Sequence, residues 1–360
     1  MKKSKKKKVQ RRIKRQIKKH RKRIKKRKKQ ARRVKRFKAP NKVKVSTKPF
    51  EAKDFLSLKE IHAGDLAMIF KLAEKMKKNP QRFYGKLKGK TLALLFQKPS
   101  IRTRVSFQVG MSQLGGNSVY VDPQEHPLGE RESIKDVARV LSRYCDAVVT
   151  RTYHHSDAEE LARYATVPVI NGLSDLYHPC QTLADLFTIR EKFKGIHKMN
   201  IAYIGDGNNV LNSLLYGASK VGANLAIAAP RGYEPSEEIM RDIKLISKES
   251  GSKITLSNNP FTAIKNAHAI YTDVWVSMGQ EKQRDQRIRD FQPFQVNGAI
   301  IGKAPKDSMI MHCLPAHRGE EITDEVIEHP RSAIFDQAEN RLHTQKALLY
   351  ILLTRKKRKK

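Results

Sequence analysis

A short segment rich in hydroxyl and guanidinium groups, Ser100 to Arg104, lies between a predicted strand and a predicted helix. Ser100 stands where the helix would begin, so the first backbone N–H groups of that helix are free to bind an anion. Arg102 can hold an oxyanion through two parallel hydrogen bonds, and Thr103 offers a hydroxyl. Taken alone, the segment fits a capped helix start with a surface arginine better than a ligand site. Its neighbours must therefore decide whether it binds phosphate.

Three further polar residues occupy positions where a ligand could meet them. Arg151 follows an apolar run, so we expect it at the carboxyl edge of a parallel sheet, where α/β proteins bind ligands. The alternative is a surface arginine that ends a strand. His178 and Gln181 are three residues apart at a predicted helix start, which places both on one side of the first turn. A lone histidine is more often a core or capping residue, so this pair needs support from elsewhere.

Two other motifs suggest chemistry but fit it poorly. Cys313 follows a predicted strand and precedes Leu314-Pro315, whose irregular backbone could turn a thiol into a cleft. A nucleophilic cysteine needs a neighbouring base, and His312 should point to the opposite face of the strand. The turn Gly205-Asp206-Gly207 lacks the full glycine pattern of a dinucleotide-binding loop and its downstream acid. Neither a cysteine hydrolase nor a dehydrogenase is expected.

The elements that must position these residues are apolar strand patterns that alternate with helical patterns from Lys90 onward. This alternation predicts an α/β fold of mainly parallel sheets with helices on both faces. In the first set, strands are predicted at 91–96, 147–150 and 167–170, and helices at 102–114 and 181–193. In the second, strands are predicted at 199–204, 225–229, 270–276 and 309–312, and residues 338–354 form a last helix.

Length and composition agree with an enzyme of two domains. The 360 residues can bury two cores with a cleft between them. No apolar run approaches the roughly 18 residues of a spanning helix, and the N-terminus has no apolar signal stretch, so we expect a cytoplasmic protein. The three cysteines are too few and too scattered for a disulfide framework or a zinc cluster. We expect neither a metal nor a cofactor.

The formal net charge of +39 is concentrated at the ends of the chain. Residues 1–38 hold 25 Lys or Arg and no acidic residue, and residues 355–360 hold 6 more. The remaining 43 basic and 35 acidic side chains give an ordinary balance for an enzyme with anionic substrates. We therefore predict a basic arm, residues 1–44, and a basic tail, residues 355–360, that flank the folded body.

The basic arm carries apolar residues at helical spacing, namely Val9, Ile13, Ile17, Ile24, Ala31 and Val34. Its dense like charge should keep it disordered in water, so a helix would form mainly against RNA, DNA or acidic lipid. A solvated tail that only raises solubility is an equally good interpretation. An organelle transit peptide is a further alternative, but the excess of lysine and the single serine, Ser4, fit it poorly.

The segment Ser100 to Arg104, followed by Val105-Ser106-Phe107, resembles the carbamoyl phosphate motif of the aspartate and ornithine carbamoyltransferases. That motif usually has threonine in second place, so Ile101 offers only its backbone N–H and should weaken the phosphate contact. The likeness runs from about residue 50 to residue 354. Further matching segments follow in order, namely Arg151-Thr152, His178-Pro179-Cys180-Gln181, Gly205-Asp206-Gly207-Asn208-Asn209, Asp273 to Gly279 and His312-Cys313-Leu314-Pro315.

The resemblance implies a carbamoyl phosphate-binding domain at 45–190, an ornithine-binding domain at 191–338 and a helix, 339–354, that returns to the first domain. In the family, His178 would donate to the carbamoyl oxygen, and Gln181 and the Leu314 carbonyl would accept from the carbamoyl nitrogen. Arg341 would reach the carbamoyl end from just before the last helix, unless it is an exposed helix-start arginine. The implied carbamoyl phosphate-binding residues are Ser100, Ile101, Arg102, Thr103, Arg151, His178, Gln181, Cys313, Leu314 and Arg341.

The second substrate is implied by the second half of the chain. In the ornithine enzymes, Asp273 and the segment Ser277-Met278-Gly279 hold the amino acid, and Asn209 reaches its α-amino or α-carboxylate group. A carboxylate such as Asp273 suits a cationic δ-amine, which Cys313 would also contact. The resemblance therefore implies carbamoyl transfer to L-ornithine, giving citrulline and phosphate. The chemistry would fall to Arg102, Arg151, His178, Asp273 and Cys313.

Other readings of the same sequence remain open. A relative that uses N-acetylornithine or putrescine would share the phosphate residues. A nucleic-acid-binding protein that keeps the fold without activity would explain the basic arm, through which weak contact with nucleic acid or an anionic membrane is also conceivable for an enzyme. The family further implies a homotrimer or a multiple of trimers.

Overall fold

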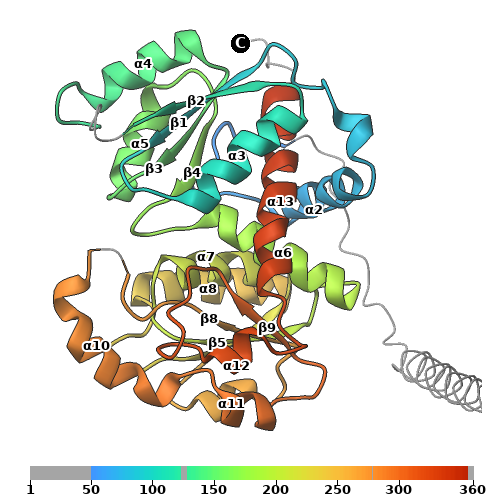
Figure 1. The fold of residues 1–360 in the computed structure, drawn as a ribbon, viewed down its shortest axis with the longest axis vertical. Coiled ribbons are helices and arrows are strands. Elements are labelled where there is room, and N and C mark those ends of the chain that lie inside the picture. Colours follow the sequence, from blue (N-terminus) through green and yellow to red (C-terminus); the bar gives the residue numbers. More distant parts are fainter. Residues whose placement is uncertain (1–49, 123–127, 278, 356–360) are drawn as a thin grey trace, which may run out of the picture. The chain divides into compact units, whose positions relative to one another are not determined.

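The first of two parallel sheets is formed by the N-terminal half of the folded chain (Figure 1). The computed structural model describes residues 50–122, 128–277 and 279–355. The strand order is β2 (Asn117–Val121), β1 (Thr91–Phe96), β3 (Ala147–Arg151) and β4 (Val169–Leu173), with every neighbouring pair parallel. The helices of this half are α2 (Ala63–Lys78), α3 (Ile101–Gln113), α4 (Ile134–Tyr144), α5 (His155–Tyr164) and α6 (Pro179–Phe193), with a 3-10 turn η1 (Pro80–Phe83).

Alternate residues of β1 point to opposite faces of this sheet, and both faces are covered. Leu92 and Leu94 pack with the core that includes residues of α2, α3 and α13 (Ile334–Thr354). Ala93 and Leu95 pack on the other face, with residues of α4 and α5 (Figure 1). A parallel sheet buried on both faces needs apolar residues at successive positions, which explains the unbroken run Leu92 to Phe96.

The second sheet has the order β7 (Ile254–Ser257), β6 (Asn224–Ala228), β5 (Asn200–Ile204), β8 (Ala269–Thr272) and β9 (Met309–His312), again all parallel. Tyr203 of β5 packs toward α7 (Asn209–Lys220) and α8 (Glu237–Ser250), and Ile204 packs on the opposite face. The remaining elements are α9 (Pro260–Ile264), η2 (Glu281–Gln283), α10 (Arg284–Phe291), η3 (Gln292–Phe294), α11 (Gly298–Lys303) and α12 (Asp324–Ile327).

The last helix, α13, leaves the second sheet and packs against α2, α3 and α6 of the first half (Figure 1). This return confirms the predicted path of the C-terminal helix. The helix begins at Ile334, four residues before the predicted start at residue 338. Arg341 lies inside it and not just before it, where the resemblance had placed it. The predicted strand at 270–276 is also shorter than expected, because β8 ends at Thr272 and leaves Asp273 at the carboxyl edge of the sheet.

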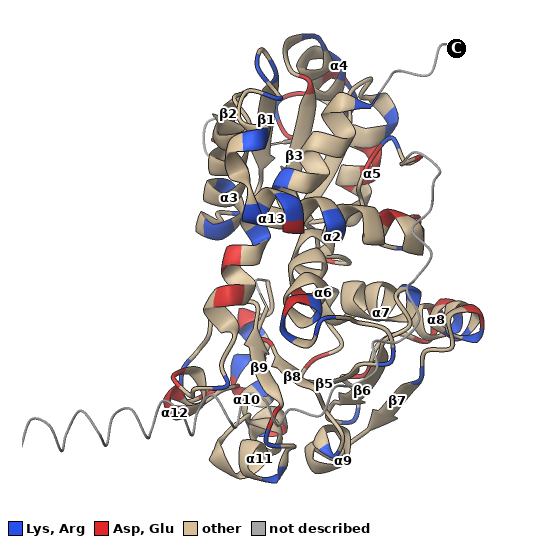
Figure 2. Cartoon of the chain, turned by 90° about the vertical axis from the view of Figure 1, so that its right-hand side faces the viewer, with Lys and Arg blue, Asp and Glu red and all other residues tan. Residues whose placement is uncertain are grey.

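Charge is balanced on the described part of the chain. Figure 2 shows Lys and Arg interspersed with Asp and Glu along α8 and α13 rather than gathered on one element. No helix in residues 50–122, 128–277 and 279–355 is both long and apolar enough to cross a membrane. The basic arm (residues 1–44) and residues 356–360 of the basic tail lie outside the described residues, as does Met278.

Candidate active site

The predicted anion segment forms the start of α3 at the carboxyl edge of the first sheet. Ser100 caps the helix, and its Oγ accepts a hydrogen bond from the Thr103 backbone N–H at 3.3 Å. The cap uses the acceptor side of this hydroxyl and leaves its O–H free to donate to an anion. Ile101 is 74% exposed, so its apolar side chain makes no core contact that would explain it. The segment is thus a capped helix start whose hydroxyl and first N–H groups are available to an anion.

The guanidinium groups of three arginines line the same cleft, next to the start of α3. Arg151 is the last residue of β3 and is only 6% exposed, while Arg341 on α13 is 3% exposed and Arg102 is half-buried. The surface-arginine readings of Arg151 and Arg341 are therefore wrong. Burial, together with Arg341 and Arg102, lowers the pKa of Arg151 to about 9. Its Nε atom is buried without a hydrogen-bond partner among the described residues, so the cluster has positive charge to offer to a ligand.

Arg341 is held in place by the two segments it connects. Its Nη1 donates to Gln181 Oε1 at 2.6 Å, and its Nη2 donates to Thr103 Oγ1 at 3.0 Å. The C-terminal helix is thereby bonded to both α6 and the anion segment. Gln181 itself is fully buried behind Arg341 and does not line the cleft, which differs from its predicted position beside the carbamoyl group.

His178 precedes α6 and is buried. Its backbone N–H donates to Ser213 Oγ at 2.7 Å, and its Nδ1 atom has no hydrogen-bond partner among the described residues. Burial and the charges of Arg341, Arg151 and Arg102 lower the pKa of His178 well below its usual value, so the ring is neutral at physiological pH. A neutral ring has one N–H to donate and one nitrogen to accept.

The second half of the chain supplies a carboxylate to the same cleft. Asp273 is buried directly after β8, where its Oδ2 accepts from Asn208 Nδ2 at 2.8 Å and its Oδ1 accepts from Cys313 Sγ at 2.8 Å. Burial and Asp273 raise the pKa of the Cys313 thiol well above its usual value. The thiol is therefore a hydrogen-bond donor and not a thiolate nucleophile at neutral pH.

His312 holds the backbone that follows it. Its Nδ1 accepts from the Leu314 N–H at 2.8 Å, and its Nε2 lies 3.0 Å from Glu321 Oε1. The two side chains lie on opposite sides of the strand, as predicted: Cys313 packs in the same core as Met309 and Met311, whereas His312 bonds Glu321 beside the core that contains Ile310. Both ring nitrogens of His312 are occupied by other partners, so no Cys–His catalytic pair forms. Leu314 adopts a φ of 57°, which is uncommon for a residue with a side chain.

The remaining predicted residues lie around the same opening. Asn209 begins α7 and donates through its Nδ2 to the Ser174 carbonyl at 2.6 Å, and the Ser277 N–H donates to Gln280 Oε1 at 3.0 Å. The cleft has a volume of about 1110 Å³. The predicted residues that line it are Ser100, Ile101, Arg102, Thr103, Arg151, His178, Asn209, Asp273, Ser277, Cys313, Leu314 and Arg341.

Several lining residues were not predicted. Asp206 and Arg287 form a buried ion pair at 2.7 Å beside Asp273, and burial raises the pKa of Asp206 to about 6. Lys98 lies 4.5 Å from the centroid of the Tyr153 ring, and burial and Arg151 lower its pKa. Asp206 lies in the glycine-rich turn that the sequence singled out. Arg287 belongs to a charged helix with no local signal, so only the fold identifies it.

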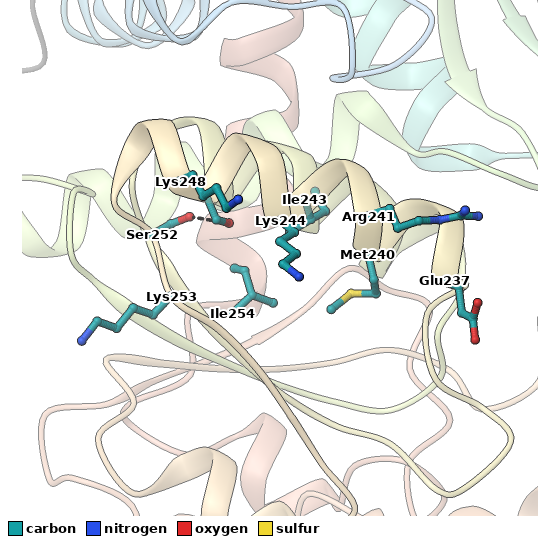
Figure 3. Close-up of a pocket in the computed structure, with 10 residues that line it drawn as sticks. Glu237, Met240, Arg241, Ile243, Lys244, Lys248, Ser252, Lys253 and Ile254 are labelled. Carbon is teal, nitrogen blue, oxygen red and sulfur yellow. Dashed lines mark hydrogen bonds between the residues drawn. The ribbon is translucent and has the colours of Figure 1, made fainter.

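A second hollow, of about 740 Å³, lies between α8 and β7 (Figure 3). Its side chains are apolar at the floor, as with Met240 and Ile254, and mostly basic at the rim, as with Lys244. It contains none of the predicted site residues. The cleft between the two sheets is therefore the candidate active site.

Comparisons with known proteins identify the family of the chain. Residues 53–191 match the carbamoyl-P binding domain of aspartate/ornithine carbamoyltransferase, and residues 197–352 match its Asp/Orn binding domain. The chain is 51% identical over 310 residues to ornithine carbamoyltransferase of Anoxybacillus flavithermus, covering 86% of this chain and 99% of the relative. It is 51% identical over 307 residues to the anabolic ornithine carbamoyltransferase of Pyrococcus furiosus, covering 84% and 96%.

Solved structures show the same likeness. The P. furiosus ornithine carbamoyltransferase structure superimposes with a TM-score of 0.82 at 50% identity and covers 85% of this chain and 98% of its own. The ornithine carbamoyltransferase from Thermus thermophilus gives a TM-score of 0.76 at 44% identity, covering 84% and 100%. On this evidence the chain belongs to the aspartate/ornithine carbamoyltransferase family.

Proposed function

We propose that the protein transfers the carbamoyl group of carbamoyl phosphate to the δ-amine of L-ornithine, giving L-citrulline and phosphate. One observation carries the choice of substrates. The cleft has a cluster of buried arginines on its first-half wall and a buried carboxylate, Asp273, on its second-half wall. A dianionic donor and a cationic amine would each meet the opposite charge there. Relatives about 50% identical bear the name ornithine carbamoyltransferase, which supports the same substrates.

Carbamoyl phosphate binding is assigned to the wall formed by α3, β3 and α13. The free N–H groups at the start of α3, including that of Ile101, and the hydroxyls of Ser100 and Thr103 suit the phosphate oxygens. Arg102 and Arg151 supply the neutralising charge. At the other end of the ligand, His178 and Arg341 would donate to the carbamoyl oxygen, and the Leu314 carbonyl would accept from the carbamoyl nitrogen together with Cys313.

The amide oxygen of Gln181 accepts a hydrogen bond from the Arg341 guanidinium and is therefore not free to bind the carbamoyl group. It can do so only if Arg341 or the Gln181 side chain moves slightly. When carbamoyl phosphate draws Arg341 toward its carbamoyl oxygen, the Gln181 oxygen becomes free to accept from the carbamoyl NH2. We therefore assign Gln181 to the carbamoyl phosphate site, with its hydrogen bond to the carbamoyl group formed only when the ligand is bound.

Ornithine is assigned to the wall formed by the second sheet. Asn209, Ser277 and Met278 would bind the α-amino and α-carboxylate groups, which need amide, hydroxyl and backbone partners. Asp273 would guide the δ-ammonium, and the Cys313 thiol, already bonded to Asp273, would lie beside it. An amine that lacks the α-amino and α-carboxylate groups would lose the contacts with Asn209, Ser277 and Met278.

The reaction needs no enzyme-bound intermediate. The δ-ammonium of ornithine, with a reference pKa of about 10.4, first loses one proton to solvent water and becomes the free amine. It then attacks the carbamoyl carbon, a C–N bond forms, and the C–O bond to phosphate breaks. The second amine proton leaves with the phosphate, which is the strongest nearby acceptor. Neutral His178 and the arginine cluster stabilise negative charge on the tetrahedral oxygen and the departing phosphate, and such fixed donors usually supply the largest share of rate enhancement.

Two substitutions test this assignment against a matched control. Arg102→Ala should reduce citrulline formation at saturating ornithine by about 10²- to 10⁴-fold, because two charge-assisted hydrogen bonds to phosphate are lost. Asp273→Asn should instead raise the KM for ornithine. Arg104→Ala is the control, since Arg104 is exposed on the same helix and stacks on Tyr120 instead of facing the cleft. Wild-type activity of Arg102→Ala would refute the phosphate assignment.

We propose a homotrimer or a multiple of trimers, which light scattering on the purified chain tests directly. The domain limits at 45–190 and 191–338 and the cytoplasmic location stay predictions. We propose that the basic arm contacts anionic surfaces independently of catalysis. Deleting residues 1–38 should leave citrulline formation intact and abolish salt-dependent binding to RNA. Loss of activity without unfolding would show that arm and enzyme are not separable.

A further inference from the structure

A buried carboxylate, Asp185, lies one helical turn after Gln181 on α6 and outside the cleft. Three side-chain donors converge on it. Its Oδ1 accepts from Gln181 Nε2 at 2.8 Å and from Gln337 Nε2 at 2.7 Å, and its Oδ2 accepts from Tyr271 Oη at 3.0 Å. The donors come from α6, α13 and β8, so this one side chain joins elements of both halves. Burial raises its pKa to about 7.

The contact with Gln181 fixes which end of the amide faces the active site. Because the Gln181 nitrogen is bonded to Asp185, the amide oxygen must point the other way, to Arg341. Arg341 in turn donates to Thr103 of the anion segment. A reversed amide would set its N–H groups against the guanidinium, which has only donors. The orientation of Gln181 therefore decides whether Arg341 is held or repelled.

The other two donors tie the same carboxylate to the ornithine wall. Gln337 bonds Asp185 through its nitrogen and accepts from the His312 backbone N–H through its oxygen at 2.9 Å. Tyr271 lies two residues before Asp273 on β8. Through Gln337 and Tyr271, Asp185 is thus linked to the two strands that precede Asp273 and Cys313.

We infer that Asp185 is a positioning residue that fixes the amide of Gln181 so that Gln181 and Arg341 are ready for the carbamoyl end of the donor substrate. This inference rests on the proposed function, since it assigns a role toward carbamoyl phosphate. Asp185 touches no substrate and acts through Gln181. Its loss should therefore affect carbamoyl phosphate more than ornithine.

The first test compares two substitutions at this position by steady-state citrulline formation. Asp185→Ala removes all three acceptor contacts, and it should raise the KM for carbamoyl phosphate and lower kcat, each by about tenfold or more. Asp185→Asn should stay within about threefold of wild type, because its oxygen can still accept from both glutamines while its nitrogen donates to Tyr271. Rescue by asparagine separates amide orientation from a need for charge.

A double-mutant cycle and a control separate positioning from general stability. In a Gln181→Leu background, Asp185→Ala should add less than about a threefold further change in the KM for carbamoyl phosphate. Thr188→Val is the control, because Thr188 also joins α6 to α13, through a hydrogen bond from Asn340 at 2.9 Å, but has no bond to Gln181. It should lower the melting temperature and leave both KM values unchanged.

The outcomes that overturn the inference are distinct from failure of the proposed function. If wild type forms no citrulline, the proposed function fails. If wild type is active and Asp185→Ala keeps its kinetic constants, or if the two effects multiply in the cycle, the inference fails alone. Should Asp185→Ala not fold, Gln181→Glu provides the same test. It sets two carboxylates against each other, and adding Asp185→Asn should recover at least about tenfold in activity by removing the repulsion between the two charges. No recovery would overturn the inference.

Discussion

Replacing Arg151 by methionine should stabilise the ligand-free protein while destroying its activity. Arg151 is a buried cation whose Nε has no partner among the described residues and which lies near Arg341 and Arg102. Its pKa falls from 12.5 to about 9 on folding. One pKa unit corresponds to about 1.4 kcal/mol, so holding the charge in the fold costs on the order of 5 kcal/mol. Methionine has a similar length and carries no charge.

The observed gain will be smaller than this cost, because water and buffer ions enter the cleft and screen the charge. We expect about 1–3 kcal/mol, in the range found when buried charges give way to apolar side chains. Thermal unfolding in phosphate-free buffer should then show a midpoint a few degrees above wild type. Trp275 is the single tryptophan and is 2% exposed, so its fluorescence can follow the transition.

Two comparisons make the result decisive. Arg163→Met removes an exposed arginine of the same half of the chain and should leave the midpoint unchanged. Adding inorganic phosphate should raise the midpoint of wild type by mass action and have little effect on Arg151→Met. A lower midpoint for Arg151→Met in phosphate-free buffer would refute the reasoning, since it would show that Arg151 is paired and stabilising before any ligand binds.

Three further predictions concern His178, the cysteines Cys145 and Cys313, and Glu321. The pKa of His178 is lower folded than its usual 6.5, so the unfolded chain binds the extra proton and stability falls as the pH drops below about 6.5. His178→Gln should reduce the loss of melting temperature between about pH 7.5 and pH 5, and an unchanged loss would contradict this. Iodoacetamide should alkylate half-buried Cys145 well before Cys313, as peptide mass spectrometry can show, and equal rates would contradict the raised Cys313 pKa. Glu321→Leu should cost about 2–4 kcal/mol by leaving His312 unpaired, whereas Glu321→Gln should cost less than half of that, and equal melting temperatures of the two would refute the contact.

Much of the fold could be predicted because parallel strands leave a local signal. The strands at 91–96 and 309–312 were predicted with the limits that the structure shows, since each is an apolar run that ends at a polar residue or turn. The edge strands β2 and β7 were missed. Both are half-exposed and short, so they lack the continuous apolar pattern of a strand buried on two faces.

Helix limits and residue environments were harder to predict where distant contacts decide them. The start of α13 was placed four residues late, and Arg341 was left as a possible surface residue. Its burial depends on Gln181 and Thr103, which are more than a hundred residues away in sequence. The strand before Asp273 was drawn too long, because the apolar residues after Asp273 lie outside the sheet. Trp275 stacks on Phe291 of α10, whereas Val274 and Val276 line the cleft.

The candidate site was predictable as a set of motifs but not as a network. The resemblance supplied the lining residues of the cleft, and the structure brings all of the described ones except Gln181 to its walls. The supporting contacts were missed. Asn208 was read as part of a turn, yet it caps α7 and holds Asp273. Arg287 and Asp185 gave no local signal, because a charged residue on a helix is usually solvated and only its partners show otherwise.

The central claim is that this chain makes citrulline from carbamoyl phosphate and ornithine. The most direct test gives the purified full-length chain saturating carbamoyl phosphate and, in turn, L-ornithine, N-acetylornithine, putrescine and L-aspartate, and measures the carbamoylated product of each. The site predicts a kcat/KM for ornithine at least about a hundredfold above that for any other amine, because each lacks a group that Asp273, Asn209 or Ser277 would bind. A preference for another amine, or no product above the uncatalysed rate with ornithine, would contradict the claim.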